Sequence, residues 1–379
     1  MPKIVILSNQ AASMANFWRK LILELQKRDF ETICFVPQGD PSAGKLSEIG
    51  ASVKFYPLDR KGLNPLKDLR TFLALKKLFS EVKPDYLFAT TIKPVIYGCR
   101  SAKSAGVPCV FATITGLGYA FESDSFLKKL LHYGAKALYR HSLKRATGIF
   151  FQNGDDRDLF FAQKIVSPNN KIFIARGTGV DTVEFSPAPF PPIEDGVRFL
   201  VVARLLVAKG LREYASAAKE LVSKYPRSKF FLLGPEETGP GGISVQEARK
   251  WEKGGVTYLG SVDDPRPILA DSHVVVLPSW REGVPTVLME AASMGRPCVA
   301  ANAPGSREVI RDSLNGFLCE VKNPQSLASA MEKFILNPEL IPIMGAAGRE
   351  IATKEFDADR VASFIVDTML ETCENSKAC

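Results

Sequence analysis

Apolar and polar residues along this chain fall into blocks that predict strands alternating with helices. Short runs rich in β-branched and aromatic residues predict buried strands at 3–8, 30–37, 53–57, 85–90, 107–114, 148–152 and 171–175. Apolar residues at helical spacing predict helices at 16–28, 65–80, 95–105, 125–145 and 155–163. Because nearly continuous apolar strands alternate with helices, the pattern indicates an α/β fold with a parallel sheet covered on both faces.

A second series of the same kind follows a proline-rich segment. SPAPFPPIEDG, at 186–196, has no periodicity and is the best candidate for a linker. A strand at 198–203 opens the second series, which runs to residue 336, and a last amphipathic helix covers 357–373. A chain of 379 residues is too long for one ordinary core. The expected domains are therefore 1–186 and 187–355, followed by a C-terminal helix within 356–379.

The strongest candidate chemistry lies around the predicted strand 274–277. Gly283 and Pro285 interrupt regular secondary structure after this strand. A helix at 286–293 follows, with Glu290 one turn beyond Thr286. This arrangement delivers Glu282 to the carboxyl edge of the sheet, where ligands of open parallel sheets bind. The free N–H groups of the helix end attract anions.

Two cations are expected at the same edge. Arg204 follows the strand that opens the second series, and Lys209 precedes the next helix. Charged donors make strong hydrogen bonds to phosphate, and paired carboxylates suit hydroxyl groups. A ligand with phosphates between two hydroxyl-bearing ends, such as a nucleotide sugar, fits this set. The alternative is a buried strand and turn with solvated charges.

Composition narrows the class of protein. An apolar content of 46% and a charged content of 24% are typical of a soluble globular protein. No run approaches the roughly 18–20 apolar residues of a membrane span, and a strand begins too early for a signal peptide. Seven cysteines without a C-x-x-C pair favour reduced thiols in a cytoplasm and no metal site.

The positive charge is concentrated in the first half. Up to Phe185 there are 27 Lys and Arg against 16 Asp and Glu, or +11, and the remainder has 22 against 25, or −3. The predicted helix 125–145 contains no acid, so it either carries a solvated basic face or meets anionic headgroups. Nucleic acid is disfavoured, since neither this helix nor the predicted helix 65–80, which is also basic, resembles a nucleic-acid-binding motif. The membrane-facing candidates are Lys128, Lys129, Lys136 and Arg140.

Several motifs resemble those of one enzyme family. EGVPTVLME, with Glu282 and Glu290, resembles the E-x7-E motif of retaining GT-B glycosyltransferases of family four, and the flanking PSW and MGRPCVA agree. TTIKPVIYG (90–98), ITGLGYAF (114–121), FQNGDDRDLF (151–160) and GTGVDTVEFSP (177–187) resemble capsule and O-antigen transferases of that family. The resemblance covers nearly the whole chain.

The resemblance implies a fold and a set of site residues. The fold would be GT-B, with two Rossmann-like parallel-sheet domains facing across a cleft and the C-terminal helix crossing back to the first domain. Arg204 and Lys209 resemble the family's R-x4-K pair, which holds the donor's diphosphate. The catalytic candidates are Glu282, Arg204 and Lys209, and the nucleotide-sugar contacts are Glu290, Gly283, Val284 and Thr286.

The activity implied is retaining transfer of a sugar, an N-acetylhexosamine from a UDP-sugar, onto an undecaprenyl-diphosphate-linked saccharide. The product would be an O-antigen, a capsule or a protein glycan, and the protein would be peripheral on the inner face of the cell membrane. Front-face attack with the leaving phosphate as base is expected. Neither a metal nor a cofactor is expected, because two cations and a helix end supply the positive field.

The acceptor side of the resemblance is less complete. Many family members carry a histidine in the loop that corresponds to 113–118, and this chain has none there. A hydroxyl or backbone contact at Thr115 would have to replace it. The candidate acceptor or phosphate contacts are Asn16, Lys93, Thr115, Gly116 and Gly118.

Two rival functions remain open. A sugar-nucleotide epimerase could share this architecture and ligand, and turnover of a nucleotide sugar without an acceptor would favour it. A non-catalytic scaffold of a membrane glycan-assembly complex would keep the basic face. The scaffold would not need Arg204, Lys209, Glu282 and Glu290 together, and all four are present.

Overall fold

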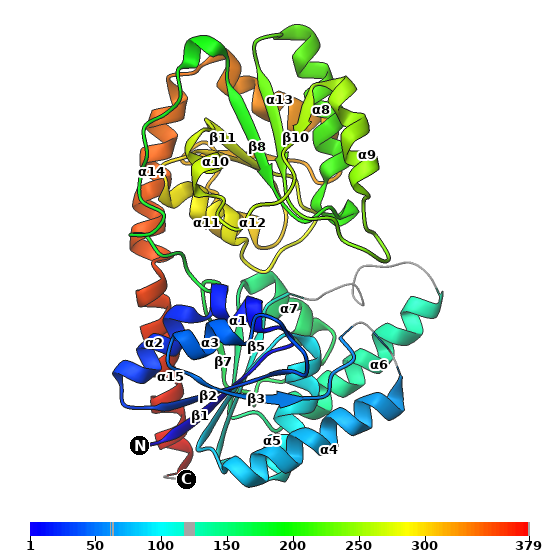
Figure 1. Ribbon diagram of the computed structural model, residues 1–379, viewed down its shortest axis with the longest axis vertical. Coiled ribbons are helices and arrows are strands. Elements are labelled where there is room, and N and C mark those ends of the chain that lie inside the picture. Colours follow the sequence, from blue (N-terminus) through cyan, green and yellow to red (C-terminus); the bar gives the residue numbers. More distant parts are fainter. Residues whose placement is uncertain (61, 63, 117–125, 378–379) are drawn as a thin grey trace. The chain divides into compact units, whose positions relative to one another are not determined.

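The chain folds into two compact units, each built on one parallel sheet (Figure 1). The computed structural model describes residues 1–60, 62, 64–116 and 126–377, with the backbone alone for 126–133 and 376–377. The first unit comprises Met1–Thr178 and Asp359–Cys379, and the second comprises Gly179–Ala358. Among the described residues, no helix combines the length and apolar character that crossing a membrane requires.

The first unit contains a seven-stranded sheet with the order β3-β2-β1-β4-β5-β6-β7. Its strands are β1 (Lys3–Leu7), β2 (Glu31–Pro37), β3 (Ser52–Tyr56), β4 (Tyr86–Thr90), β5 (Cys109–Ile114), β6 (Gly148–Phe151) and β7 (Ile172–Ile174). All neighbouring strands pair in parallel. The strand order reverses between β1 and β4, which is where open α/β sheets bind ligands.

Helices cover both faces of this sheet. They are α1 (Ala11–Phe17), α2 (Arg19–Lys27), α3 (Gly44–Glu48), α4 (Pro65–Val82), the π-helix η1 (Pro94–Gly98), α5 (Cys99–Ser104), α6 (Phe126–Leu143), α7 (Gly154–Ala162) and α15 (Ala358–Lys377). Helices α1, α2, α3 and α15 share one buried cluster with the strands, and α4, α5, α6 and α7 share the other. The predicted parallel sheet with two covered faces is confirmed for this unit.

The start of the first helix was predicted wrongly. Residues 11–15 are not a loop: α1 begins at Ala11 and buries Ala11, Met14 and Ala15 on one side. The backbone N–H of Ala11 donates to the Asp40 carboxylate at 2.7 Å. Because that capping group comes from a distant segment, no local signal marks the helix start. Asn16 consequently lies near the end of α1 and is exposed, rather than at a helix start.

A disulfide corrects the expectation that all thiols are reduced. Cys109, at the start of β5, is bonded to Cys373 in α15, with Cα atoms 5.9 Å apart. The two cysteines are 264 residues apart in sequence, so their spacing gave no sign of a pair. Arg28 also contacts α15, donating a hydrogen bond to Ser363 at 2.7 Å and forming an ion pair with Asp367. Helix α15 is therefore part of the first unit's core.

The second unit contains a six-stranded parallel sheet with the order β10-β9-β8-β11-β12-β13. Its strands are β8 (Arg198–Val202), β9 (Lys229–Leu233), β10 (Val256–Tyr258), β11 (Val274–Leu277), β12 (Cys298–Ala301) and β13 (Gly316–Cys319). Its α-helices are α8 (Leu211–Lys224), α9 (Val245–Lys250), α10 (Arg266–Ala270), α11 (Thr286–Ser293), α12 (Ser306–Val309), α13 (Pro324–Leu336) and α14 (Leu340–Glu355). The 3₁₀ turns are η3 (Ile193–Asp195), η4 (Val207–Lys209) and η5 (Trp251–Gly254). This order is that of a Rossmann sheet, and the reversal falls between β8 and β11.

The proline-rich segment 186–196 packs onto the second unit. The buried guanidinium of Arg296 donates to the carbonyls of Ala188 (2.7 Å) and Pro189 (2.8 Å) and lies 4.3 Å from the centre of the Phe190 ring. Burial lowers the pKa of Arg296 to about 10. His273 accepts a hydrogen bond from the Arg198 N–H and contacts the Pro191 carbonyl at 2.9 Å. These contacts hold the segment on the second unit, although η3 is its one regular element among the described residues.

Candidate active site

The candidate residues of the second unit gather where its strand order reverses. Arg204 and Lys209 follow β8, and Glu282 and Thr286 follow β11, which pairs directly with β8. Parallel strands end at the same edge of the sheet, so both loops lie at its carboxyl edge. This placement brings two cations, a carboxylate and a helix N-terminus to one edge.

Lys209 and Glu282 form an ion pair. The Lys209 ammonium group donates to the Glu282 carboxylate, and the two side chains are 21% and 15% exposed. Lys209 ends the short turn η4, and Gly210 follows in a left-handed conformation with φ 69°. The main predicted cation and the main predicted acid therefore contact each other.

Arg204 is the more exposed cation of the pair. Its guanidinium donates to the Glu237 carboxylate at 2.9 Å, and 58% of its side chain is exposed. An exposed ion pair of this kind contributes little to stability. Arg204 can therefore exchange Glu237 for a phosphate group at little cost.

Backbone contacts fix the loops that carry these residues. The Trp280 N–H donates to the Ala208 carbonyl at 2.9 Å, and the Glu282 N–H donates to the Pro304 carbonyl at 3.0 Å. At Gly210 an added Cβ would lie 2.2 Å from the Pro278 carbonyl oxygen. The loop after β8 and the loop after β11 are therefore packed closely against each other. Glu282 and Lys209 are thus held by a rigid backbone, as a site for a defined ligand requires.

Helix α11 leaves one narrow face uncovered. Of its eight residues, all within the described part of the chain, Thr286 and Glu290 are the two whose side chains are not buried. They are four residues apart, so they lie on the same side of the helix. Pro285 occupies the N-cap position, and no side chain caps this end. The Leu288 N–H donates to the Pro285 carbonyl at 3.2 Å, so the N–H groups of Thr286 and Val287, which precede the first intrahelical bond, are the ones that can meet an anion.

Glu290 has an unusual pKa. Its side chain is half-buried, and burial raises the pKa of the carboxyl to about 7, with a smaller contribution from the nearby Glu184. A carboxyl that titrates near neutrality either donates or accepts a hydrogen bond, depending on pH. Such a group is typical of a functional site rather than of a solvated helix face.

Two serines that the sequence did not single out also lie at this edge. Ser279 follows β11, and Ser306 begins α12 after β12. Both hydroxyl groups are fully buried and have no hydrogen-bond partner in the part of the chain that the structure describes. Buried hydroxyl groups without partners are costly, so a ligand or an ordered water would complete them. Serine in a strand–loop segment is too common for sequence to have marked them.

The first unit carries a matching group of hydroxyls where its own strand order reverses. Ser8 follows β1, Thr90 ends β4, and Thr113 in β5 is paired in register with Thr90. These side chains follow Ile6, Phe88 and Phe111 by two residues, and therefore point to the same face of the sheet. The three hydroxyls, together with that of Thr91, are buried without a partner among the described residues.

The predicted acceptor contacts fare differently. The ammonium group of Lys93 donates to the carbonyls of Asp59 and Gly62, both at 2.8 Å, and to the Asp68 carboxylate at 2.7 Å. All three of its hydrogens are used within the first unit, so the geometry favours a structural role for Lys93. Thr115 and Gly116 follow β5 and are half-buried, whereas Gly118 lies outside the described residues.

Helix α6 shows only part of its predicted basic face. The exposed Arg140 donates to the carbonyls of Lys164 (2.6 Å) and Gln163 (3.4 Å), and Lys136 is half-buried. Lys128 and Lys129 belong to α6, but their side chains lie outside the described residues. The basic face of α6 stays a prediction.

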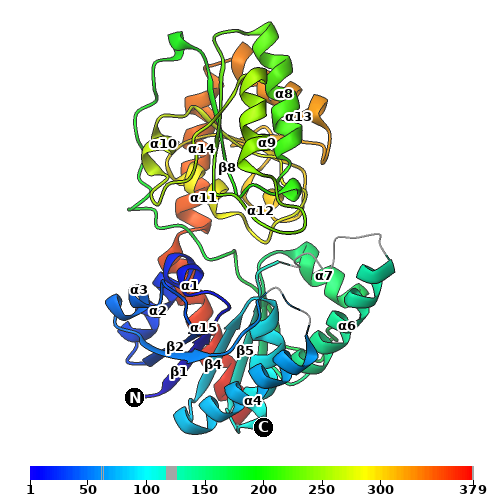
Figure 2. The same cartoon turned by 45° about the vertical axis from the view of Figure 1, so that its right-hand side comes forward.

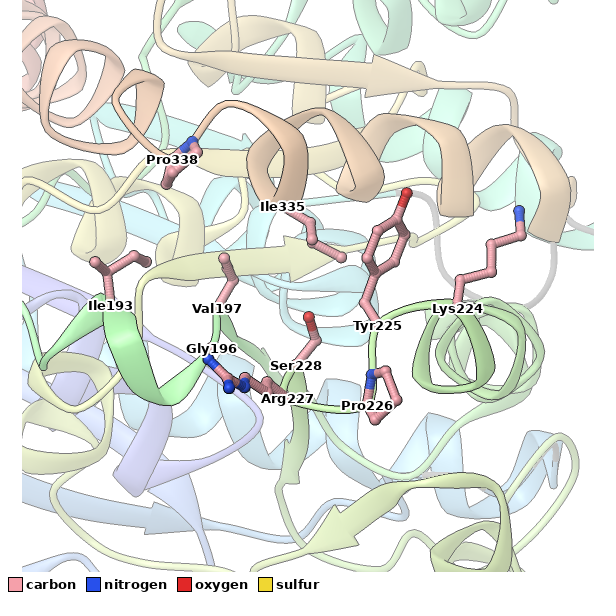
Figure 3. A pocket seen from close by; sticks show the side chains of 10 residues that line it. All are labelled: Ile193, Gly196, Val197, Lys224, Tyr225, Pro226, Arg227, Ser228, Ile335 and Pro338. Atoms are coloured by element: carbon pink, nitrogen blue, oxygen red, sulfur yellow. The ribbon is translucent and has the colours of Figure 1, made fainter.

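A cavity of about 360 Å³ in the second unit lies away from this site (Figure 3). Its lining includes Gly196 and Val197, just before β8, and Arg227 and Ser228, just before β9. It therefore lies at the amino edge of the sheet, opposite the edge that carries Lys209 and Glu282. Among the described residues, no three His, Cys, Asp or Glu side chains are grouped so as to hold a metal ion.

Comparisons with known proteins match segments of both units to glycosyltransferases. Residues 3–153 match the family model described as glycosyl transferase 4-like, and residues 196–337 match that of the glycosyl transferases group 1. A Campylobacter jejuni protein named N,N'-diacetylbacillosaminyl-diphospho-undecaprenol alpha-1,3-N-acetylgalactosaminyltransferase is 28% identical over 349 residues, covering 89% of this chain and 90% of that protein. An Escherichia coli UDP-Gal:alpha-D-GlcNAc-diphosphoundecaprenol alpha-1,3-galactosyltransferase is 28% identical over 335 residues, covering 83% and 84%.

Solved structures share the fold over the whole chain. Anabaena HepE in complex with UDP and glucose has a TM-score of 0.77 at 16% identity and covers 98% of this chain and 100% of its own. Sucrose-phosphate synthase from Thermosynechococcus elongatus has a TM-score of 0.80 at 15% identity, covering 98% and 99%. The fold and the motifs at the β8–β11 edge define a GT-B glycosyltransferase. Within that class, the chain belongs to family four, among the group 1 enzymes that build glycans.

Proposed function

We propose that this chain is a retaining, metal-independent glycosyltransferase. It moves a sugar, an N-acetylhexosamine from a UDP-sugar, onto an undecaprenyl-diphosphate-linked saccharide. The observation that carries the proposal is the Lys209–Glu282 ion pair beside the open end of α11, at the reversal between β8 and β11. The names of the Campylobacter jejuni and Escherichia coli relatives, both acting on diphospho-undecaprenol-linked sugars, support the choice of acceptor.

In this proposal the donor's diphosphate replaces carboxylates as the partner of both cations. Arg204 leaves Glu237 and Lys209 leaves Glu282, and both cations then donate to phosphate oxygens beside the N–H groups of α11. Negative charge grows on the diphosphate as the glycosidic bond breaks. Donors already aimed at those oxygens stabilise that charge, which is usually the largest single contribution to catalysis.

The carboxylates hold the two ends of the donor. Glu282, released from Lys209, accepts hydrogen bonds from hydroxyls of the transferred sugar. Glu290 accepts from the ribose hydroxyls, and its uncovered position four residues after Thr286 supports that role. The acceptor oxygen attacks the anomeric carbon on the face from which the diphosphate leaves, and its proton passes to the departing phosphate oxygen.

The first unit supplies the acceptor side. Lys93 is engaged in its own network, so the unpartnered hydroxyls of Ser8, Thr90 and Thr113 are better candidates for contact with the acceptor saccharide. Basic residues of α6, Lys128, Lys129, Lys136 and Arg140, meet anionic headgroups at the inner face of the cell membrane, where a lipid-linked acceptor resides.

The test is a transfer assay with a panel of UDP-, GDP- and TDP-sugars and an undecaprenyl-diphosphate-linked saccharide, with and without a chelator. Product should form with a UDP-N-acetylhexosamine, should survive the chelator, and should retain the donor's anomeric configuration by NMR. An arm without acceptor tests the epimerase alternative. Isomerised nucleotide sugar in that arm, with no product in the others, would replace the proposal.

A further inference from the structure

Helix α4 presents an apolar stripe to solvent. Leu66, Leu69 and Leu73 are 77%, 53% and 55% exposed, and their spacing of three and four residues places them on one face. The opposite face packs Leu75 and Phe79 into the core. A surface helix of a globular protein normally carries polar residues on its outer face. Helix α4 instead has one apolar face packed into the core and a second apolar face exposed to solvent.

The stripe belongs to a well-formed helix end rather than to a frayed one. The Asn64 side chain accepts from the N–H groups of Leu66 (2.9 Å) and Lys67 (3.4 Å), and Pro65 occupies the first helical turn. Asp68 accepts from Lys93 at 2.7 Å and from the Tyr97 hydroxyl at 2.8 Å. The acid in this half of α4 is therefore held by an internal network and does not oppose an anionic partner.

Basic side chains surround the leucines. The exposed cations of α4 are Lys67, which pairs with Asp59 at 3.0 Å, and Arg70, Lys76 and Lys77. The one other acid of α4, Glu81, lies four residues beyond Lys77 at the far end of the helix, and their charged atoms are 3.9 Å apart. Leucines flanked by lysine and arginine fit an interface that is apolar at depth and anionic at its surface. An anionic lipid bilayer has that structure.

We propose that α4 docks this protein on an anionic membrane by inserting Leu66, Leu69 and Leu73 among the lipid acyl chains. Its cations remain among the headgroups. The inference extends the proposed function, in which the acceptor is carried by a membrane lipid, and adds an apolar component to the electrostatic one assigned to α6. Helices α4, α5 and α6 pack on the same face of the first sheet, so α4 and α6 lie on one side of this unit (Figure 2).

The test compares Leu66→Ser/Leu69→Ser/Leu73→Ser with wild type in co-sedimentation with phosphatidylglycerol–phosphatidylcholine vesicles. The variant should lose roughly tenfold or more in partitioning, because each leucine removes several buried methylene groups from the membrane-bound state. Its circular dichroism and melting temperature should match those of wild type, since these side chains contribute little to the core. Leu336→Ser/Ile343→Ser is the matched control: both residues are about as exposed, at 60% and 62%, but lie in the second unit. It should bind vesicles like wild type.

Salt and depth readouts separate this inference from simple attraction of charges. Wild type should keep a salt-resistant fraction on the vesicles, and the triple variant should lose it. In Leu69→Trp the added fluorescence should shift to the blue on the vesicles, whereas Leu336→Trp should show no shift.

Two outcomes would overturn the inference. One is unchanged vesicle binding by the triple variant. The other is a wild-type dimer in sedimentation that becomes a monomer in the triple variant, with equal vesicle binding, which would make the stripe an interface between copies. Failure of the proposed function would give a different result. A chain that binds vesicles through α4 but transfers no sugar would contradict the proposed transfer reaction and leave the membrane-docking role of α4 intact.

Discussion

Glu282→Gln separates the two roles proposed for Glu282, which are to neutralise Lys209 and to hold the transferred sugar. Glu282 neutralises Lys209 through their ion pair, so the carboxylate competes with a diphosphate for the ammonium group. The Glu282 carboxylate would also repel a diphosphate bound to Lys209. Two unit charges of like sign about 8 Å apart repel each other by roughly 2 kcal/mol at an effective dielectric constant of about 20. Both side chains retain some exposure, so about 1 kcal/mol is expected, or roughly fivefold tighter binding of UDP.

Sugar transfer should change in the opposite direction. UDP lacks the sugar that Glu282 is proposed to hold, whereas the transition state contains it. Loss of one preorganised polar contact typically lowers the rate by about a hundredfold or more. Calorimetric titration with UDP and a product assay at saturating donor would measure the two effects on the same preparation.

The matched control is Glu332→Gln. Glu332 accepts from the Tyr225 hydroxyl at 2.9 Å beside the cavity at the amino edge of the same sheet. Its loss should leave both UDP affinity and transfer unchanged. If Glu282→Gln weakened UDP binding, or left transfer at the wild-type rate, Glu282 would not be the residue that competes for Lys209 and grips the sugar.

Three further predictions concern single features of the two units. Because burial raises the pKa of Glu290 to about 7, UDP should bind more tightly as pH rises through 7 and the carboxyl becomes a full acceptor. The folded chain also holds this proton more tightly than the unfolded chain. The free energy of unfolding should therefore fall between about pH 4.5 and 7, relative to Glu290→Gln. A pH-independent Kd for wild type would exclude Glu290 from the ribose site. Arg296→Met leaves the buried carbonyls that hold segment 186–196 without their donor and should lower the free energy of unfolding in urea by roughly 1–3 kcal/mol, against little change for the exposed Arg249→Met. Equal stability of the two variants would show that the segment needs no anchor. Thr90→Val and Thr113→Val replace unpartnered hydroxyls by methyl groups, so the free energy of unfolding should stay the same or rise by up to about 1 kcal/mol. The KM for the acceptor should rise, and the affinity for UDP should not change. Loss of stability with an unchanged KM would assign these hydroxyls to the core.

Much of the fold could be predicted because its strands are buried on both faces. Runs such as residues 4–7 of β1 and Val274–Leu277 are continuously apolar, and such runs alternate with helices in both units. The start of α1 could not be predicted, because its buried residues are two alanines and a methionine and its cap comes from Asp40. The packing of 186–196 likewise depends on Arg296, about a hundred residues away in sequence.

The candidate site divides in the same way. Arg204, Lys209 and Glu282 could be found because they lie in the loops and turns after predicted strands, and Glu290 because it stands eight residues after Glu282, in the resembled E-x7-E motif. Their pairing could not be found, since Lys209 and Glu282 are separated by 73 residues and meet only through the β8–β11 neighbourhood. The unpartnered hydroxyls were invisible for another reason, because only a packed structure shows which hydroxyl groups lack a partner.

The most direct test of the diphosphate site is the Kd for UDP, measured by calorimetry in the presence of a chelator. Wild type should bind one UDP per chain. Arg204→Gln and Lys209→Met should each bind roughly tenfold more weakly or worse, because each loses a hydrogen bond to a charged group, with an unchanged melting temperature. Equal affinity of wild type and both variants would contradict the placement of the donor diphosphate at the β8–β11 edge.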